Sequence, residues 1–205
     1  MIVGMSSVPA VPVSGSALAA SLPSPPAPTE SDRRSAVLES ALLTFARFGY
    51  QKTSMNEVAR AARISRPGLY FLFDSKPALF RAAATQALLR DLETIERVLA
   101  DTATPLDERL VRAFDTWAGS YVGPLTADIS AVIADNPDLL GAVVETAPRR
   151  FEELVTAAIA ARASAGAAAP VAQTLISASL GIKHQAASRD DYLARMTVAI
   201  GVVLR

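Results

Sequence analysis

Side chains suited to contact nucleic acid gather in one short stretch of the sequence. Arg66 directly follows Ser65, and Tyr70 lies four residues further on, about one helical turn away on the same face. An arginine guanidinium carries paired N–H donors that match guanine O6 and N7, or a phosphate. The alternative for Arg66 is a solvated side chain, and Phe71 can either touch bases or pack inside. This stretch is therefore a candidate DNA-binding surface.

Residues at predicted helix starts add sites for phosphate. Ser54 and Glu57 have the Ser-x-x-Glu spacing of a capping box, and Ser65 can cap a further short helix. Unpaired N–H groups and the helix dipole attract anions, so side chains at these starts can clamp phosphates as well as cap the helices. Simple capping is the alternative, and both roles can hold. The residues expected at DNA are Lys52, Thr53, Ser54, Ser65, Arg66, Pro67, Gly68, Tyr70, Phe71 and Lys76.

Helical periodicity surrounds these residues. Apolar residues recur at intervals of three and four over 33–48, and Gly49 is placed to end that helix. Two short helices follow, one over 54–62 and one after Ser65, joined by a turn of three or four residues. This arrangement is that of a helix-turn-helix.

A small core and one long helix complete the predicted DNA-binding part. The core residues expected to hold the two short helices together are Val58, Ala62, Ile64, Leu69 and Phe73. Ser75 can then cap a helix from Lys76 to about Ala100. At 1.5 Å per residue such a helix is roughly 37 Å long, which is enough to connect two domains.

The residues from Gly49 to Phe80 resemble the N-terminal signature of the TetR family of bacterial one-component transcription regulators. The matching positions are Gly49, Tyr50, Thr53, Ser54, Glu57, Val58, Ala59, Ala62, Ser65, Arg66, Leu69, Tyr70, Phe73, Ser75 and Lys76. The resemblance implies an all-α, TetR-like fold with a three-helix DNA-binding domain, a long linking helix, and a helical ligand-binding and dimerisation domain. It implies that Tyr70 meets a phosphate or a thymine methyl, with core packing as the alternative. It also favours a repressor, since repression is the family default.

The predicted turn departs from the family pattern. The family commonly has glycine there in a left-handed conformation, whereas this chain has Arg63. An L-residue in that conformation costs on the order of 1 kcal/mol, and a positive charge beside DNA can offset the strain. Gly68 weakens its own helix by up to about 1 kcal/mol relative to alanine and can permit close approach of the backbone to DNA.

The distribution of charge agrees with a DNA-binding segment, although the net charge is zero. Residues 31–82 carry nine Lys or Arg against four Asp or Glu, whereas residues 83–205 carry eleven against fifteen. A basic block followed by a mildly acidic remainder indicates two separate functions on one chain, the first of which involves phosphates.

The composition gives no support to several other classes of protein. The chain has no Cys, which excludes disulfides, thiolate metal sites and cysteine nucleophiles. Its single His, His184, cannot by itself form a metal cluster. There is no phosphate loop and no paired-carboxylate pattern, so we expect neither an enzyme nor a cofactor. No run of about 18 uncharged apolar residues occurs, so we expect no membrane span and a cytoplasmic location. His184 fits a cation or solvated group at a helix C-terminus.

Aromatic and apolar residues in the second half of the chain form a candidate effector pocket. Phe114, Trp117 and Tyr121 lie three and four apart on one predicted helix face. Core packing is the alternative, but in the family that this chain resembles, helices of this region enclose a small-molecule effector. Trp117 and Tyr121 add polar groups to apolar walls, which favours a moderately hydrophobic ligand. Arg149 and Arg150 either pair with an acidic ligand or are solvated. The candidate pocket residues are Phe114, Trp117, Tyr121, Ile129, Ile133, Val143 and Phe151.

The last two predicted helices, 169–183 and 189–204, carry apolar residues on two faces each. If one face packs within the protomer, the second needs a partner. Two helices from each subunit can form a two-fold four-helix bundle, and packing of each stripe on its own domain is the alternative. The expected dimer residues are Ala172, Leu175, Ile176, Ser179, Ile182, Met196, Ala199, Ile200 and Val203.

These observations divide the chain into three expected parts. Residues 1–30, rich in Pro, Ser and Ala, are expected to form a disordered tail, with a secretory signal or a misassigned start codon as alternatives. The DNA-binding domain is expected at 31–80 and the ligand-binding and dimerisation domain at 81–205, with an Ala and Gly loop at 163–169. The expected function is a homodimeric regulator released from a palindromic operator by a small molecule. The alternative is an all-helical small-molecule-binding protein or enzyme that does not bind an operator.

Overall fold

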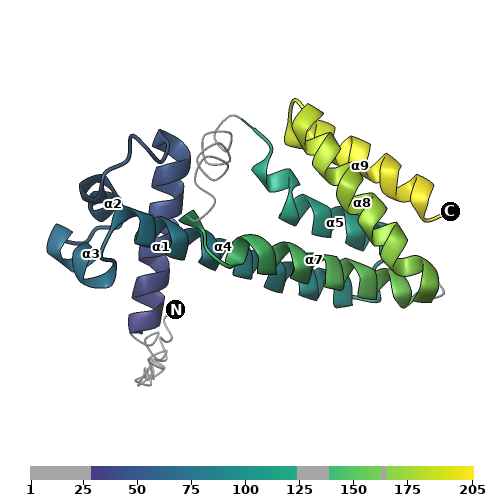
Figure 1. Cartoon of the computed structure of the whole chain (residues 1–205), viewed down its shortest axis with the longest axis horizontal. Helices are drawn as coiled ribbons and strands as arrows, with labels where there is room; N and C mark the ends of the chain where they lie inside the picture. The colour runs from purple at the N-terminus through teal and green to yellow at the C-terminus, as the bar shows by residue number, and fades with distance from the viewer. Residues whose placement is uncertain (1–28, 124–138, 163–164) are drawn as a thin grey trace, which may run out of the picture.

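The computed structural model describes residues 29–123, 139–162 and 165–205. These residues form eight α-helices and one 3-10 helix with no strand among them, which confirms the expected all-α fold. Figure 1 shows α1 to α3 at one end of the long helix α4, and α5, α8 and α9 towards the other. No helix in the described ranges combines the length and the apolar character needed to cross a bilayer. The elements are α1 Glu30–Phe48, α2 Met55–Ala61, α3 Arg66–Leu72, α4 Lys76–Ala100, α5 Leu106–Trp117, η1 Gly119–Tyr121, α7 Val143–Ala160, α8 Ala165–Gln185 and α9 Arg189–Val203.

Local capping explains where the first helices begin and end. At α1, Thr29 and Asp32 form a capping box, and Gly49, with a φ of 83°, follows the last turn. At α2, the Ser54 hydroxyl accepts the Glu57 N–H and the Glu57 carboxylate accepts the Ser54 N–H, as the spacing predicts. The predicted serine caps of α3 and α4 are present as well. Each cap satisfies backbone groups that a helix end leaves unpaired.

Aromatic rings join α1 to the start of α4. The ring centroids of Phe45, Tyr50 and Phe80 lie 5.6, 5.3 and 4.9 Å apart in the three pairs. Of the predicted helix-turn-helix core, Val58, Leu69 and Phe73 are buried, and Ala62 and Ile64 pack against it partly buried. This shared core fixes the position of α3 on the rest of the N-terminal part.

The long helix α4 connects the two parts of the molecule, with the predicted bounds Lys76–Ala100. It packs against α1 and also against α5 and α7. Gln86 donates from Nε2 to the carbonyl of Ser35 at 3.2 Å, and Arg90 pairs with Glu39, so polar contacts tie α4 to α1. A shift of α4 would therefore move α1 with it or break these contacts.

The start of α8 differs from the expectation. A loop was expected at 163–169, but α8 begins at Ala165, and Pro170 lies in its second turn. Alanine is the best helix former, and α8 packs closely against α7, so propensity and packing offset the hydrogen bond that the proline removes.

The end of α5 differs as well. One helix face was expected to run from Phe114 to Tyr121, but α5 ends at Trp117 and Tyr121 lies in η1. Gly119 permits this tight turn beside α9, because a Cβ there would lie 2.5 Å from Asp115 Oδ1 and 3.0 Å from the Tyr192 ring. Tyr121 therefore points from a turn rather than from the α5 face.

Candidate functional site

Helix α3 presents large side chains to solvent. Leu69 is fully buried and anchors the helix, whereas Tyr70 is 40% exposed and Phe71 is 85% exposed. The Arg66 guanidinium carbon lies 5.6 Å from the Tyr70 ring centroid. The structure thus places neither aromatic ring in the core, and together with Arg66 the two rings form an exposed contact surface.

The turn before α3 has the left-handed backbone that the sequence pattern predicts. Arg63 has a φ of 55°, the one positive value among the described residues other than glycine. The Ile64 N–H donates to the Ala59 carbonyl at 3.0 Å and the Arg63 N–H to the Arg60 carbonyl at 3.2 Å, which satisfies carbonyls at the end of α2. The strain at Arg63 is therefore part of the turn that aims α3.

The start of α3 explains Gly68. Ser65 accepts the Gly68 N–H at 3.1 Å through its hydroxyl. A Cβ at residue 68 would lie 3.0 Å from that hydroxyl oxygen and would press on the cap. Pro67, in the first turn, is exposed beside it. Ser65 and Gly68 thus form a tight, capped helix start that leaves the side chains of Arg66 and Pro67 exposed to solvent.

Lys52 and Thr53 occupy different environments at the start of α2. The Thr53 side chain is buried, and its hydroxyl donates to the Gly49 carbonyl at 2.8 Å. Lys52 is exposed. Of these two neighbours, Lys52 is the one whose side chain is accessible to a phosphate.

Lys76 has an internal role instead of the expected contact with phosphate. Its Nζ donates to the carbonyls of Tyr50, Gln51 and Thr53 at 3.0, 3.4 and 3.1 Å. An ammonium has three N–H donors, so all of them are used. Lys76 therefore holds the loop between α1 and α2 onto the start of α4, and the expectation that it clamps DNA does not fit this arrangement.

A cavity of about 420 Å³ lies between α1, α4, α5, η1, α7 and α8. This volume is within the range of small-molecule sites. Four expected pocket residues line it, namely Phe114, Trp117, Tyr121 and Phe151. Val143 is buried but is not part of the wall, and Ile129 and Ile133 lie outside the described residues.

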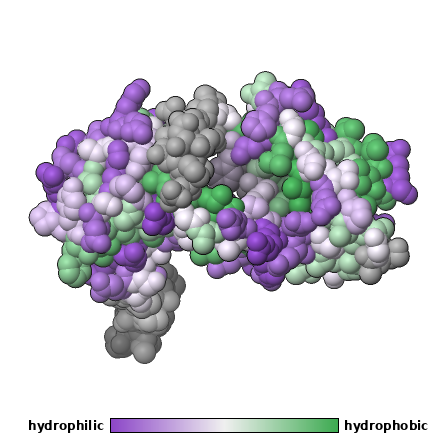
Figure 2. Space-filling model, viewed as in Figure 1, coloured by the Kyte–Doolittle hydropathy of each residue, from purple (hydrophilic) through white to green (hydrophobic). Residues whose placement is uncertain are grey.

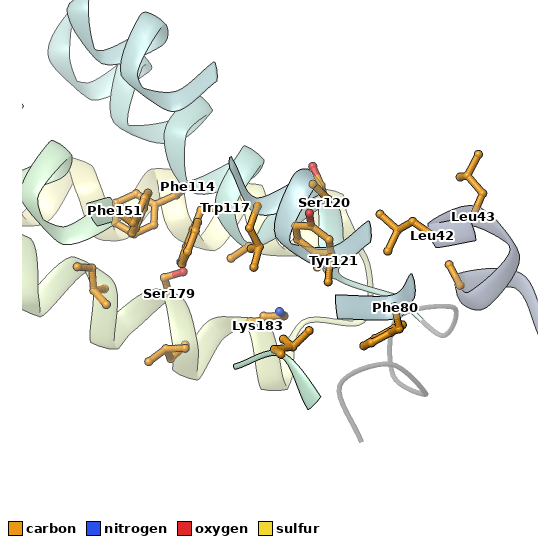
Figure 3. Close-up of a pocket in the computed structure, with 18 residues that line it drawn as sticks. Leu42, Leu43, Phe80, Phe114, Trp117, Ser120, Tyr121, Phe151, Ser179 and Lys183 are labelled. Carbon is orange, nitrogen blue, oxygen red and sulfur yellow. The ribbon is translucent and has the colours of Figure 1, made fainter. Parts of the chain in front are cut away.

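One wall of the cavity is aromatic. Trp117 stacks on Phe151 with ring centroids 4.6 Å apart and ring planes 7° apart, and Phe114 meets the same ring edge-on at 5.2 Å. Figure 3 shows these three rings together, with Tyr121, Lys183 and Phe80 further along the cavity. Core packing and pocket lining are thus combined in the same residues.

A polar pair lies beside this wall. The Tyr121 hydroxyl donates to Asp91 Oδ2 at 2.5 Å. Burial raises the pKa of Asp91 above its ordinary value, and the hydrogen bond from Tyr121 opposes that shift. Burial and the neighbouring carboxylate both raise the pKa of Tyr121, so its hydroxyl stays protonated.

The sequence interpretation missed the walls that come from α1, α4 and α8. The residues that α1 and α8 contribute are Leu42, Leu43, Ala46, Ile176, Ser179, Leu180 and Lys183. On α8, Ile176, Ser179 and Lys183 recur at intervals of three and four, which is the signal for a shared helix face. Of these three residues, Ile176 and Ser179 had been expected at a dimer interface.

Most residues expected at the dimer interface are buried within the protomer. Ala172, Leu175, Ser179, Met196 and Ile200 are at most 3% exposed. Ile176 lines the cavity, and Ile182, Ala199 and Val203 are half-buried. Tyr192 explains this packing, because its fully buried ring lies between the helices and its hydroxyl contacts Ser179 at 2.7 Å. Most of the residues expected at the dimer interface therefore pack α9 against α8 and α5 within one protomer.

The charged residues singled out near the pocket lie on the surface. Arg150 donates to Glu96 at 3.0 Å and to Glu153 at 3.4 Å, and neither Arg149 nor Arg150 lines the cavity. These arginines are solvated, as in the alternative given above. His184 is exposed in the last turn of α8, where a cation was expected.

Comparison with known proteins agrees with this architecture. Residues 37–83 match the family described as bacterial regulatory proteins, tetR family. The chain is 32% identical over 82 residues to the uncharacterized HTH-type transcriptional regulator YhgD of Bacillus subtilis, covering 40% of this chain and 42% of that protein. It is 37% identical over 60 residues to the probable acrEF/envCD operon repressor of Escherichia coli, covering 29% of this chain and 27% of that protein. The match thus spans less than half the length of these two relatives.

The likeness in structure extends further. A protein from Mesorhizobium loti described as a TetR-family transcriptional regulator superposes with a TM-score of 0.70 at 20% identity, covering 86% of this chain and 97% of that one. At that identity the likeness concerns the fold. Residues 37–83 therefore match the family of bacterial regulatory proteins of the tetR type, and the described residues of the chain have an all-α, TetR-like fold.

Proposed function

We propose that this protein is a transcription regulator that binds operator DNA as a homodimer and releases it when a small molecule occupies the cavity. One observation carries the proposal: within the segment that matches the TetR family, α3 holds Arg66, Tyr70 and Phe71 on an exposed face. The name of the Escherichia coli relative favours repression. Such a protein acts in the cytoplasm, where bacterial DNA lies.

In this proposal α3 enters the major groove. Arg66, at its first position, reads a guanine or grips the adjacent phosphate, and Tyr70 and Phe71 contact the backbone or base edges. The exposed Lys52 and the unpaired N–H groups at the starts of α2 and α3 bind phosphates. Phosphate contacts then set position, and Arg66 supplies sequence selectivity.

A dimer follows from the short length of α3, because one such helix reads too few base pairs for a specific site. The surface that we propose for it is the exposed face of α8 and α9, where Val198 and Val202 are 66% and 65% exposed and Leu180, which also lines the cavity, is 57% exposed. Figure 2 shows apolar residues at this end of the molecule. Gly181 and Gly201 lie on the same helices with open space around them, which permits a second helix to approach closely.

The walls of the cavity suggest how a ligand changes DNA binding. Leu42, Leu43 and Ala46 belong to α1 of the DNA-binding part, whereas Ile176 and Lys183 belong to α8. A ligand between them would contact both parts and favour one arrangement of α1 and α4 over another. Coupling requires a different affinity for the two arrangements, typically 1–3 kcal/mol.

The cavity alone would also suit a helical small-molecule-binding protein that does not bind DNA. Fluorescence anisotropy with labelled duplex DNA from the promoter beside the gene separates the two functions. The proposal expects saturable binding that weakens steeply with salt and exceeds binding to a shuffled duplex. Equal affinity for the promoter and the shuffled duplex would leave the small-molecule-binding function.

A further inference from the structure

Lys183 is the charged residue in the cavity wall. Besides the indole N–H of Trp117, the polar side-chain groups of that wall are the hydroxyls of Ser120, Tyr121 and Ser179, and each hydroxyl has a partner. Ser120 donates to the Asp115 carbonyl, Tyr121 donates to a carboxylate, and the Ser179 hydroxyl lies 2.7 Å from that of Tyr192. The hydroxyls are thus engaged in holding the protein together.

The ammonium of Lys183 has no such partner among residues 29–123, 139–162 and 165–205. Its Nζ lies 5.7 Å from the Tyr121 ring centroid, which is a cation–π contact, and no hydrogen bond or ion pair joins it to a described residue. Burial lowers the pKa of the Lys183 ammonium, as expected where apolar walls replace water and no anion compensates. A ligand that brought a negative charge to this point would relieve that cost.

The carboxylate of Asp91, which Tyr121 contacts, does not take this role. Asp91 accepts the hydroxyl of Tyr121 and is not part of the cavity wall. Figure 3 shows Lys183 between the aromatic wall and the leucines of α1, with apolar side chains on either side. Among the described residues, the wall therefore offers one positive charge beside mostly apolar side chains.

We propose that the effector is an amphipathic monoanion, a carboxylate on an aliphatic or aromatic body, whose head pairs with the Lys183 ammonium while its body packs on Trp117, Phe114 and Phe151. This inference rests on the proposed effector pocket and names the class of ligand that it takes. An apolar body matches the aromatic wall, and a single negative charge matches the single lysine. Neutral or cationic molecules of the same shape leave the ammonium uncompensated.

The chain carries its own probe for this test. Trp117 is the one tryptophan of the sequence and lines the cavity, so its fluorescence reports occupation. Full-length protein without DNA is titrated with decanoate and phenylbutyrate, with decanol and phenylbutanol as neutral matches, and with decylammonium as a cation. We expect the carboxylates to bind roughly ten- to a hundred-fold more tightly than their alcohols, as for a hydrogen bond to a charged group.

Variants separate the charge from the fold. Lys183→Met keeps an apolar chain of similar length and should remove the preference for carboxylate while leaving alcohol affinity within about two-fold, whereas Lys183→Arg should retain the preference. Arg162→Met removes an exposed cation outside the cavity and should change neither affinity. Circular dichroism confirms that each variant is folded.

Several results would overturn the inference: equal affinity for acid and alcohol, tighter binding of decylammonium, an unchanged preference in Lys183→Met, or no saturable binding of either carboxylate. The test uses no DNA, so its failure can be distinguished from failure of the proposed DNA binding. Carboxylate binding by a protein that fails to bind the promoter would leave the inference standing and reject the regulator. Promoter binding without carboxylate binding would reject the inference and leave the proposed DNA binding standing.

Discussion

The Lys76 ammonium lies 4.5 Å from the Tyr50 ring centroid and donates to the Tyr50 carbonyl at 3.0 Å, so one side chain fastens the start of α4 to the loop after α1. The Tyr50 ring in turn packs on Phe45 and Phe80. The contact therefore connects the aromatic core of the N-terminal part to the helix that reaches the cavity. A residue that looks like a phosphate ligand in the sequence is a structural link.

Replacing that link should destabilise the fold. Lys76→Met leaves three carbonyls without their donor and should lower the free energy of unfolding by about 2 kcal/mol, as for the loss of hydrogen bonds to a charged group. Urea denaturation followed by circular dichroism measures this. Lys52→Met, on an exposed side chain, is the control and should change stability by less than about 0.5 kcal/mol. Equal stabilities of the two variants would refute the structural role of Lys76.

Relieving the strained turn should stabilise the protein. Arg63→Gly places glycine at a φ of 55° and should raise the free energy of unfolding by about 0.5–1 kcal/mol, after allowing for the greater freedom of glycine in the unfolded chain. Arg60→Gly, inside α2, is the matched control and should lower stability by about 1 kcal/mol. Chemical denaturation of both variants decides the point, and a destabilised Arg63→Gly would contradict it.

Base reading and phosphate binding should respond to different substitutions. Arg66→Ala should weaken the specific site by about 1–3 kcal/mol while changing random DNA little. Lys52→Ala should weaken all sequences alike and reduce the slope of log affinity against log salt by about one. Anisotropy titrations over a salt series measure both effects. An equal loss on specific and random DNA for Arg66→Ala would exclude a base contact.

The proposed dimer surface should be sensitive to charge. Val198→Glu and Val202→Glu together place carboxylates on side chains that are 66% and 65% exposed in the protomer, and they should favour monomers by burying unpaired charge at the two-fold. Val144→Glu, on an apolar side chain of α7 that is 41% exposed, should leave the dimer intact. Sedimentation velocity at micromolar concentration distinguishes these outcomes. A wild-type monomer, or a doubly substituted dimer, would rule out this surface.

The half-buried carboxyl of Asp91 should make stability depend on pH. Burial raises its pKa in the folded protein, so the folded state binds more protons than the unfolded chain at weakly acidic pH. The stability from this group is present at pH values below its unfolded pKa and is lost as pH rises through its folded pKa. The stability of the wild type relative to Asp91→Asn should therefore increase on acidification from pH 7 to about pH 4. Urea midpoints at both pH values measure it, and a change in the opposite direction would show that the hydrogen bond from Tyr121 outweighs burial.

The sequence by itself determined the N-terminal part in detail. Its signals are local: the Ser54–Glu57 capping box, the serine before each following helix and the turn at Arg63 depend on residues within about five positions of each other. The outward face of α3 also followed from helical period once Leu69 was assigned to the core. Backbone hydrogen bonding and period act over one or two turns, and one sequence displays them completely.

Only the tertiary structure decided which apolar face of each C-terminal helix meets which neighbour. The sequence shows that Leu175 and Ile176 are both apolar, but only the fold distinguishes them. Leu175 is buried inside the protomer, where Ser179 contacts Tyr192, whereas Ile176 and Lys183 line the cavity. The role of Lys76 likewise depends on a loop about 25 residues away in the chain. The burial of apolar surface is non-directional. An apolar face on a helix therefore predicts that this face is covered, but the segment that covers it is known only once distant parts of the chain are brought together.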